Sequence, residues 1–225
     1  MERGSLPPWD SVTPYAVIMA PKRGELGRSA RRGFTLVELM IVVAIVGVLA
    51  ILAVVGFSKL IGSSRTTEAI GTVNAIKVAQ EAYHAETGTY ANLSSTLCTT
   101  TSCSSLYPTI PAGKSAVGDY KVGWGVACGS ACQTGMDWSM LPVHISGGVM
   151  YGYSTTAGFA GTSVTPSPIT LPNGPSSTYT VTFPAVAPSD WFLATGVGDE
   201  NMDGIPCVVL GTSFTNDLQV ANEGE

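Results

Sequence analysis

The apolar residues of this chain are concentrated in one segment near its amino terminus. A run of 24 residues, 34–57, is interrupted only by Thr35 and Glu38, and its last 19 residues contain no polar side chain. A helix of this length spans about 36 Å, which exceeds the roughly 30 Å hydrocarbon core of a bilayer. The pattern therefore predicts a membrane-spanning helix over residues 34–57.

After Phe57 the apolar positions recur at steps of three and four residues, which predicts that the helix continues as an amphipathic helix over 58–87. The residues of this stripe are Ala69, Ile70, Val73, Ile76, Ala79, Gln80 and Tyr83. A stripe of this kind is suited to packing on a sheet. Gly47 and Gly56 each weaken the helix, so they are positions either for bending or for close helix packing.

Residues 88–225 are rich in Ser, Thr, Gly and Pro, and they contain short alternating runs that are typical of strands separated by turns. We expect a surface loop over 161–177. The predicted strands are 120–127, 149–155, 178–183, 191–197 and 208–212. A long helix followed by antiparallel strands predicts an α+β fold, in which the amphipathic half of the helix packs on the sheet of a globular head.

Charge divides the chain into a basic start and an acidic remainder. The formal net charge is −5, yet residues 1–33 hold six of the eleven Lys and Arg residues. By the positive-inside rule, this basic segment keeps the amino terminus in the cytoplasm and sends the head outward. The acidic balance argues against nucleic-acid binding, and the low charged fraction of 12% argues against a disordered chain.

The junction between the basic segment and the apolar run has a specific pattern. A basic pair precedes Gly33 and Phe34, and Glu38 is an acid at a fixed distance inside the apolar run. This combination resembles the class III signal of type IV prepilins and pseudopilins. The resemblance implies that a prepilin peptidase cuts after Gly33, that residues 1–33 are a leader, and that a methyltransferase modifies the new amine of Phe34. The leader is long for this family, and a start at Met19 would shorten it to 15 residues.

The resemblance also implies a role for Glu38 in assembly. Its carboxylate would meet the Phe34 ammonium of a neighbouring subunit, and this pair would fix the register because an unpaired charge in an apolar fibre core is costly. The implied partners are further copies of the chain, the processing enzyme and an inner-membrane assembly platform.

Five cysteines lie in the part of the chain that this topology exports, where disulfides are the default. Close spacing favours the pairs Cys98–Cys103 and Cys128–Cys132 and leaves Cys207 over, although other pairings stay open because a sequence alone fixes no connectivity. A zinc site is the alternative interpretation of the same residues.

An acidic turn near the carboxyl terminus places oxygen ligands at alternate positions. Asp199, Asn201 and Asp203 match the first half of a calcium loop, but Leu210 stands where such a loop has a bidentate acid. The segment also resembles the acidic turn of several pilins and pseudopilins, some of which bind calcium. The alternative is a solvated hairpin whose Asp and Asn side chains cap their own backbone.

No motif for catalysis is evident, since Gly113 to Ser115 lack the first Gly of a P-loop and no G-x-S-x-G elbow occurs. The sequence therefore predicts a structural protein and not an enzyme: a type IV pilin, first held in the inner membrane, that polymerises into a surface fibre for adhesion or motility. One alternative is a minor pilin or a type II secretion pseudopilin, the latter periplasmic. The other is a single-span, membrane-anchored binding protein.

Overall fold

The structure, a computed structural model, describes residues 33–109, 118 and 120–223. A single α-helix, α1, covers Leu36–Thr87. The chain divides into two compact units between Val46 and Gly47, so the start of α1 belongs to the first unit and the rest of α1 to the second. Two short 3-10 helices follow, at Gly129–Ala131 and Trp138–Met140. The strands of the described residues are β1 Val122–Gly123, β2 Gly148–Val149, β3 Gly152–Gly158, β4 Ile169–Pro172, β5 Thr178–Val181, β6 Trp191–Gly198, β7 Cys207–Thr212 and β8 Gln219–Ala221.

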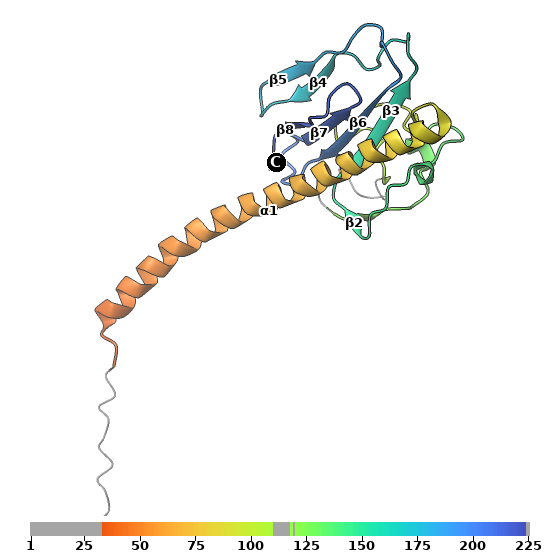
Figure 1. Cartoon of the computed structure of the whole chain (residues 1–225). Helices are drawn as coiled ribbons and strands as arrows, with labels where there is room; N and C mark the ends of the chain where they lie inside the picture. Colours follow the sequence, from red (N-terminus) through yellow and green to blue (C-terminus); the bar gives the residue numbers. More distant parts are fainter. Residues whose placement is uncertain (1–32, 110–117, 119, 224–225) are drawn as a thin grey trace, which may run out of the picture. The chain divides into compact units, whose positions relative to one another are not determined.

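The head is built on a four-stranded antiparallel sheet in the order β3-β6-β7-β8, and the second half of α1 runs across it (Figure 1). All residues of β6 and β7 are buried. Glycines allow the helix to approach the sheet closely, because a Cβ at Gly196 or Gly211 would lie 3.2 or 2.9 Å from the side chain of Val73. The predicted α+β class is confirmed.

The helical stripe predicted from the sequence faces this sheet. Ala69, Val73, Ile76 and Ala79 are at most 2% exposed and belong to the main hydrophobic core. Gln80 is also fully buried, and its amide is satisfied because Nε2 donates to Ala91 O at 2.8 Å while Oε1 accepts from Ala91 N at 2.8 Å. The stripe therefore packs on the sheet through its apolar side chains and is joined to the loop after the helix by the hydrogen bonds of Gln80.

Two sequence predictions about strands are wrong. The segment 161–177, predicted as a loop, contains β4, which pairs with β5 and buries Ile169 and Leu171 on one face. Four alternating residues between two proline-containing turns give too short a pattern to recognise in the sequence. The predicted strand 120–127 is reduced to the two residues of β1, and β8 was not predicted.

Both short-range disulfides form, Cys98–Cys103 and Cys128–Cys132, as the spacing favoured. Cys207 is a free, buried thiol at the start of β7. Burial raises the pKa of this thiol, so it is kept protonated and unreactive at neutral pH.

Candidate functional site at the amino-terminal apolar helix

The first turns of α1 expose an unusual amount of apolar surface. Phe34 is 85% exposed, and the 19 residues Leu36–Val54 have a mean hydropathy of 3.0 with no residue of the span buried. A helix that is apolar on all sides is stable only when something covers it. This helix is long and apolar enough to cross a membrane, and a bilayer or other apolar helices would supply the missing contacts.

The start of the helix is fixed by a capping box that the sequence analysis did not identify. Thr35 is the residue before the helix, and its Oγ1 accepts a hydrogen bond from Glu38 N at 3.2 Å. In return, Glu38 Oε2 accepts from Thr35 N at 2.9 Å and from Thr35 Oγ1 at 2.8 Å. The T-x-x-E spacing in the sequence was the signal for this motif. In a capping box, each of the two side chains accepts a hydrogen bond from the backbone N–H of the other residue.

The capping box changes the picture of Glu38. The carboxylate is exposed and within its own chain it stabilises the helix start, so it has a local role in addition to any role between subunits. Among the described residues, the ion pairs of the chain do not involve Glu38. A charge of this kind remains available to a cation from outside the subunit.

The comparisons with known proteins concern this same region. Residues 28–54 match the family described as Prokaryotic N-terminal methylation motif. The chain therefore carries the N-terminal methylation motif, which is the class III signal of type IV pilins. Its amino-terminal part is similar to Fimbrial protein Q of Moraxella bovis, at 46% identity over 54 residues that make up 24% of this chain and 34% of that protein. The chain thus matches about a third of the length of this relative, and no solved structure matches it.

This prepilin-type signal contains three of the residues singled out in the sequence. Gly33 is exposed and open, since a Cβ there would meet nothing within 4 Å. Phe34 precedes α1, and Glu38 lies in its first turn. Cleavage after Gly33, methylation of Phe34 and the assembly role of Glu38 stay predictions. The rest of the predicted leader, residues 1–32, lies outside the described residues.

The acidic turn between β6 and β7 adopts a self-capped geometry. Asp199 Oδ2 accepts from Gly204 N at 2.9 Å, Asn201 Oδ1 from Asp203 N at 2.9 Å, and Asp203 Oδ1 from Ile205 N at 2.8 Å. Within the described part of the chain, no three His, Cys, Asp or Glu side chains gather as metal ligands. These hydrogen bonds match the alternative of a hairpin whose side chains cap their own backbone. However, Asp199 Oδ1 is buried and has no hydrogen-bond partner among the described residues, so the calcium site stays a prediction.

A polar cluster, formed by Arg65, Tyr151 and Glu200, connects α1 to the same turn, and the Tyr151 and Glu200 side chains are buried in it. Tyr151 Oη donates to Glu200 Oε1 at 2.8 Å, and Arg65 Nη1 lies 3.6 Å from Glu200 Oε2. The Glu200 side chain is only 4% exposed, and this burial raises the pKa of its carboxyl although both partners oppose the shift. This cluster was not predicted, because its members are far apart along the chain.

Proposed function

We propose that this chain is a structural subunit that polymerises through its amino-terminal helix into a type IV pilus. The observation that carries the proposal is the methylation motif at 28–54, which includes the exposed apolar span Leu36–Val54. A helix that merely anchors a protein needs no such signal. In a fibre, the apolar side chains of neighbouring helices would replace the bilayer around one another.

In this proposal Glu38 sets the axial register of the fibre. The uncut chain has a peptide bond between Gly33 and Phe34, so no ammonium exists there until the leader is removed. Once it is formed, the Phe34 ammonium is a cation that the exposed Glu38 carboxylate of a neighbour can pair with. Both charges would lie in an apolar core, where an unpaired charge is costly. The register that brings the Phe34 ammonium to the Glu38 carboxylate is therefore favoured over the others.

The nearest alternative is a type II secretion pseudopilin, and the similarity to a fimbrial protein favours the pilus. The adhesion or motility of the fibre would be a property of the assembled pilus. Both proposals require the prepilin peptidase, the methyltransferase and an inner-membrane assembly platform as partners.

Mass spectrometry of the amino terminus in two fractions, sheared surface fibres and inner membrane, tests the proposal. Methylated Phe34 in the sheared fibres is the expected result. Methylated Phe34 found only in the cell envelope would favour the pseudopilin. An uncut chain beginning at Met1 or Met19 would contradict both and favour a membrane-anchored binding protein.

A further inference from the structure

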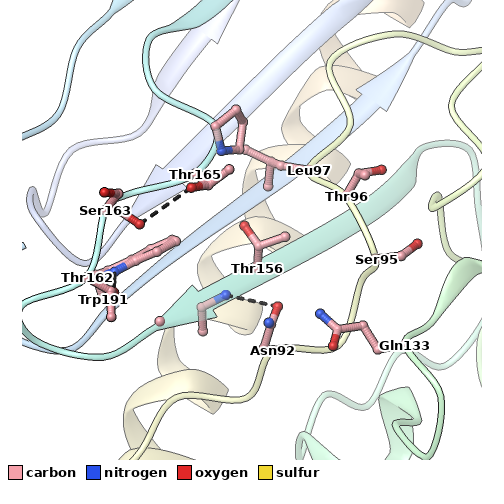
Figure 2. Close-up of a pocket in the computed structure, with 13 residues that line it drawn as sticks. Asn92, Ser95, Thr96, Leu97, Gln133, Thr156, Thr162, Ser163, Thr165 and Trp191 are labelled. Atoms are coloured by element: carbon pink, nitrogen blue, oxygen red, sulfur yellow. Dashed lines mark hydrogen bonds between the residues drawn. The ribbon is translucent and has the colours of Figure 1, made fainter. Parts of the chain in front are cut away.

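The head contains a cavity of about 570 Å³ whose lining combines polar and apolar groups and is uncharged. Thirteen residues line it, from the loop 92–97, from Gln133, and from the end of β3 and the loop after it to Pro166, with Trp191 of β6 (Figure 2). Eight have neutral polar side chains, and none of these described residues is Asp, Glu, Lys, Arg or His. The volume is typical of sites for small organic ligands.

Two amide side chains at the cavity each use one of their two polar atoms in a hydrogen bond to the backbone and leave the other polar atom without a partner. Asn92 Oδ1 accepts from Ala157 N at 3.2 Å, and Gln133 Nε2 donates to Ser94 O at 3.2 Å. Among the described residues, Asn92 Nδ2 and Gln133 Oε1 have no hydrogen-bond partner, so one donor and one acceptor are fixed at the cavity wall (Figure 2).

The cavity lining includes a third polar group without a hydrogen-bond partner. Thr156 of β3 is 8% exposed, and its hydroxyl is buried without a hydrogen-bond partner in the described structure. An unsatisfied buried hydroxyl is unfavourable for folding. Because Thr156 lines the same cavity as the two amides, a ligand group that reached this hydroxyl would complete its hydrogen bonding.

Apolar surface completes the lining. Leu97 and Pro166 contribute to it, and the indole of Trp191 packs at the end of β3 because Gly158 has no side chain there. A Cβ at Gly158 would lie 2.6 Å from the Trp191 ring. The cavity thus combines neutral donors and acceptors with patches that fit C–H groups.

The walls are also held rigidly, and both disulfides take part. Leu97 directly precedes Cys98 of one disulfide, and Gln133 directly follows Cys132 of the other. The two walls are joined because Gln133 N donates to Leu93 O at 2.7 Å. Such preorganisation lowers the entropic cost of binding.

We infer that this cavity binds an uncharged saccharide unit, a hexose or an N-acetylhexosamine. Sugar hydroxyls donate and accept hydrogen bonds at once, as the mixed lining requires, and the C–H faces of the ring fit the apolar patches. An ionised ligand would find no opposite charge, and a purely apolar one would leave the amides and hydroxyls unpaired. The inference concerns the head alone and does not depend on polymerisation.

The test uses the full chain in a zwitterionic detergent, because a glycoside detergent would itself compete. Saturation-transfer NMR and calorimetry are run with glucose, galactose, mannose, N-acetylglucosamine and N-acetylgalactosamine, and with sialic acid and a tri-alanine peptide as contrasts. We expect at least one neutral sugar to bind with a dissociation constant of about 1 mM or tighter. Binding of none of them, or of sialic acid or the peptide alone, would overturn the inference.

Two nearly isosteric variants locate the site. Asn92→Asp keeps the acceptor for Ala157 N and removes the unused donor, and Thr156→Val removes only the buried hydroxyl; each is expected to weaken binding about tenfold. Thr156→Val should melt at the same temperature or higher, because an unpaired polar group is lost. Their matched controls, Asn173→Asp and Thr170→Val, change exposed residues away from the cavity and should leave binding unchanged. Equal binding by all four variants would place the sugar elsewhere and contradict the assignment.

Discussion

The two halves of α1 belong to one continuous helix but differ in what covers their apolar side chains. In the first half, Leu36–Val54, none of the apolar span is buried, whereas in the second half Val73 and Ile76 are fully buried against the sheet. The second half is therefore satisfied by its own chain, and the first half needs a bilayer or other subunits. Mutations in the two halves should consequently affect different properties.

The largest expected effect concerns processing at the start of the first half. We expect Gly33→Leu to leave the leader uncut and Phe34 unmethylated, because the bulky side chain occupies the position before the cleaved bond. Intact-mass measurement of the membrane fraction detects this. Gly47→Leu, also next to open space, should be cut normally, and the head should melt unchanged in both variants. Normal cleavage of the Gly33→Leu chain would refute the assignment of this junction.

The next effect separates the two halves by stability. Ile76→Ala removes a fully buried side chain from the core and should lower the free energy of unfolding by about 2–5 kcal/mol. Leu52→Ala, at a residue that is 65% exposed, should change the stability of the head by less than about 0.5 kcal/mol. Thermal or denaturant unfolding in detergent measures both values. Similar losses in both variants would show that the comparison between the halves is wrong.

A smaller effect concerns the polar cluster of Arg65, Tyr151 and Glu200. Because the pKa of Glu200 is raised in the folded chain, the folded state holds this proton more tightly than the unfolded state does. Its contribution to stability is therefore fully present below the ordinary pKa near 4.5 and is lost as the pH rises through the raised value. Glu200→Gln should flatten the fall of stability in that window, while Glu86→Gln, at an exposed residue, should not. An unchanged pH profile for the Glu200→Gln chain would contradict the shift.

The acidic turn gives the smallest effect, and here two interpretations make opposite predictions. A calcium site predicts that calcium raises the melting temperature relative to a chelator, and that Asp199→Asn abolishes the rise. The self-capped hairpin predicts equal melting temperatures in both conditions. A control variant, Asp217→Asn, lies outside the turn and should respond to calcium as the unaltered chain does.

Features with a local period or a short spacing could be predicted from the sequence. The buried stripe from Ala69 to Gln80 follows the helical period, and Cys98–Cys103 and Cys128–Cys132 form over short loops. The capping box of Thr35 and Glu38 could also have been predicted from its spacing, but the sequence analysis assigned Glu38 only a role in assembly.

Features built from distant segments could not be predicted in this way. The cavity of the head brings Asn92, Gln133 and Thr156 together only through the fold, and none of them stands out in its local sequence. The same holds for Glu200, whose partners Arg65 and Tyr151 lie on a helix and beside a strand far away in the chain. Strand β4 was missed for a different reason, since an alternation of only four residues next to prolines is too short to recognise.

The central claim, that the charge of Glu38 aligns subunits in a fibre, is tested most directly by Glu38→Gln. Glutamine keeps an acceptor for Thr35 N, so the capping box survives and only the charge is lost. Thr35→Val is the matched control, because it removes the capping hydroxyl and keeps the carboxylate. We predict that, at equal membrane levels, Glu38→Gln reduces the yield of sheared fibres at least tenfold and Thr35→Val reduces it far less. A normal fibre yield from the Glu38→Gln chain would contradict the claim.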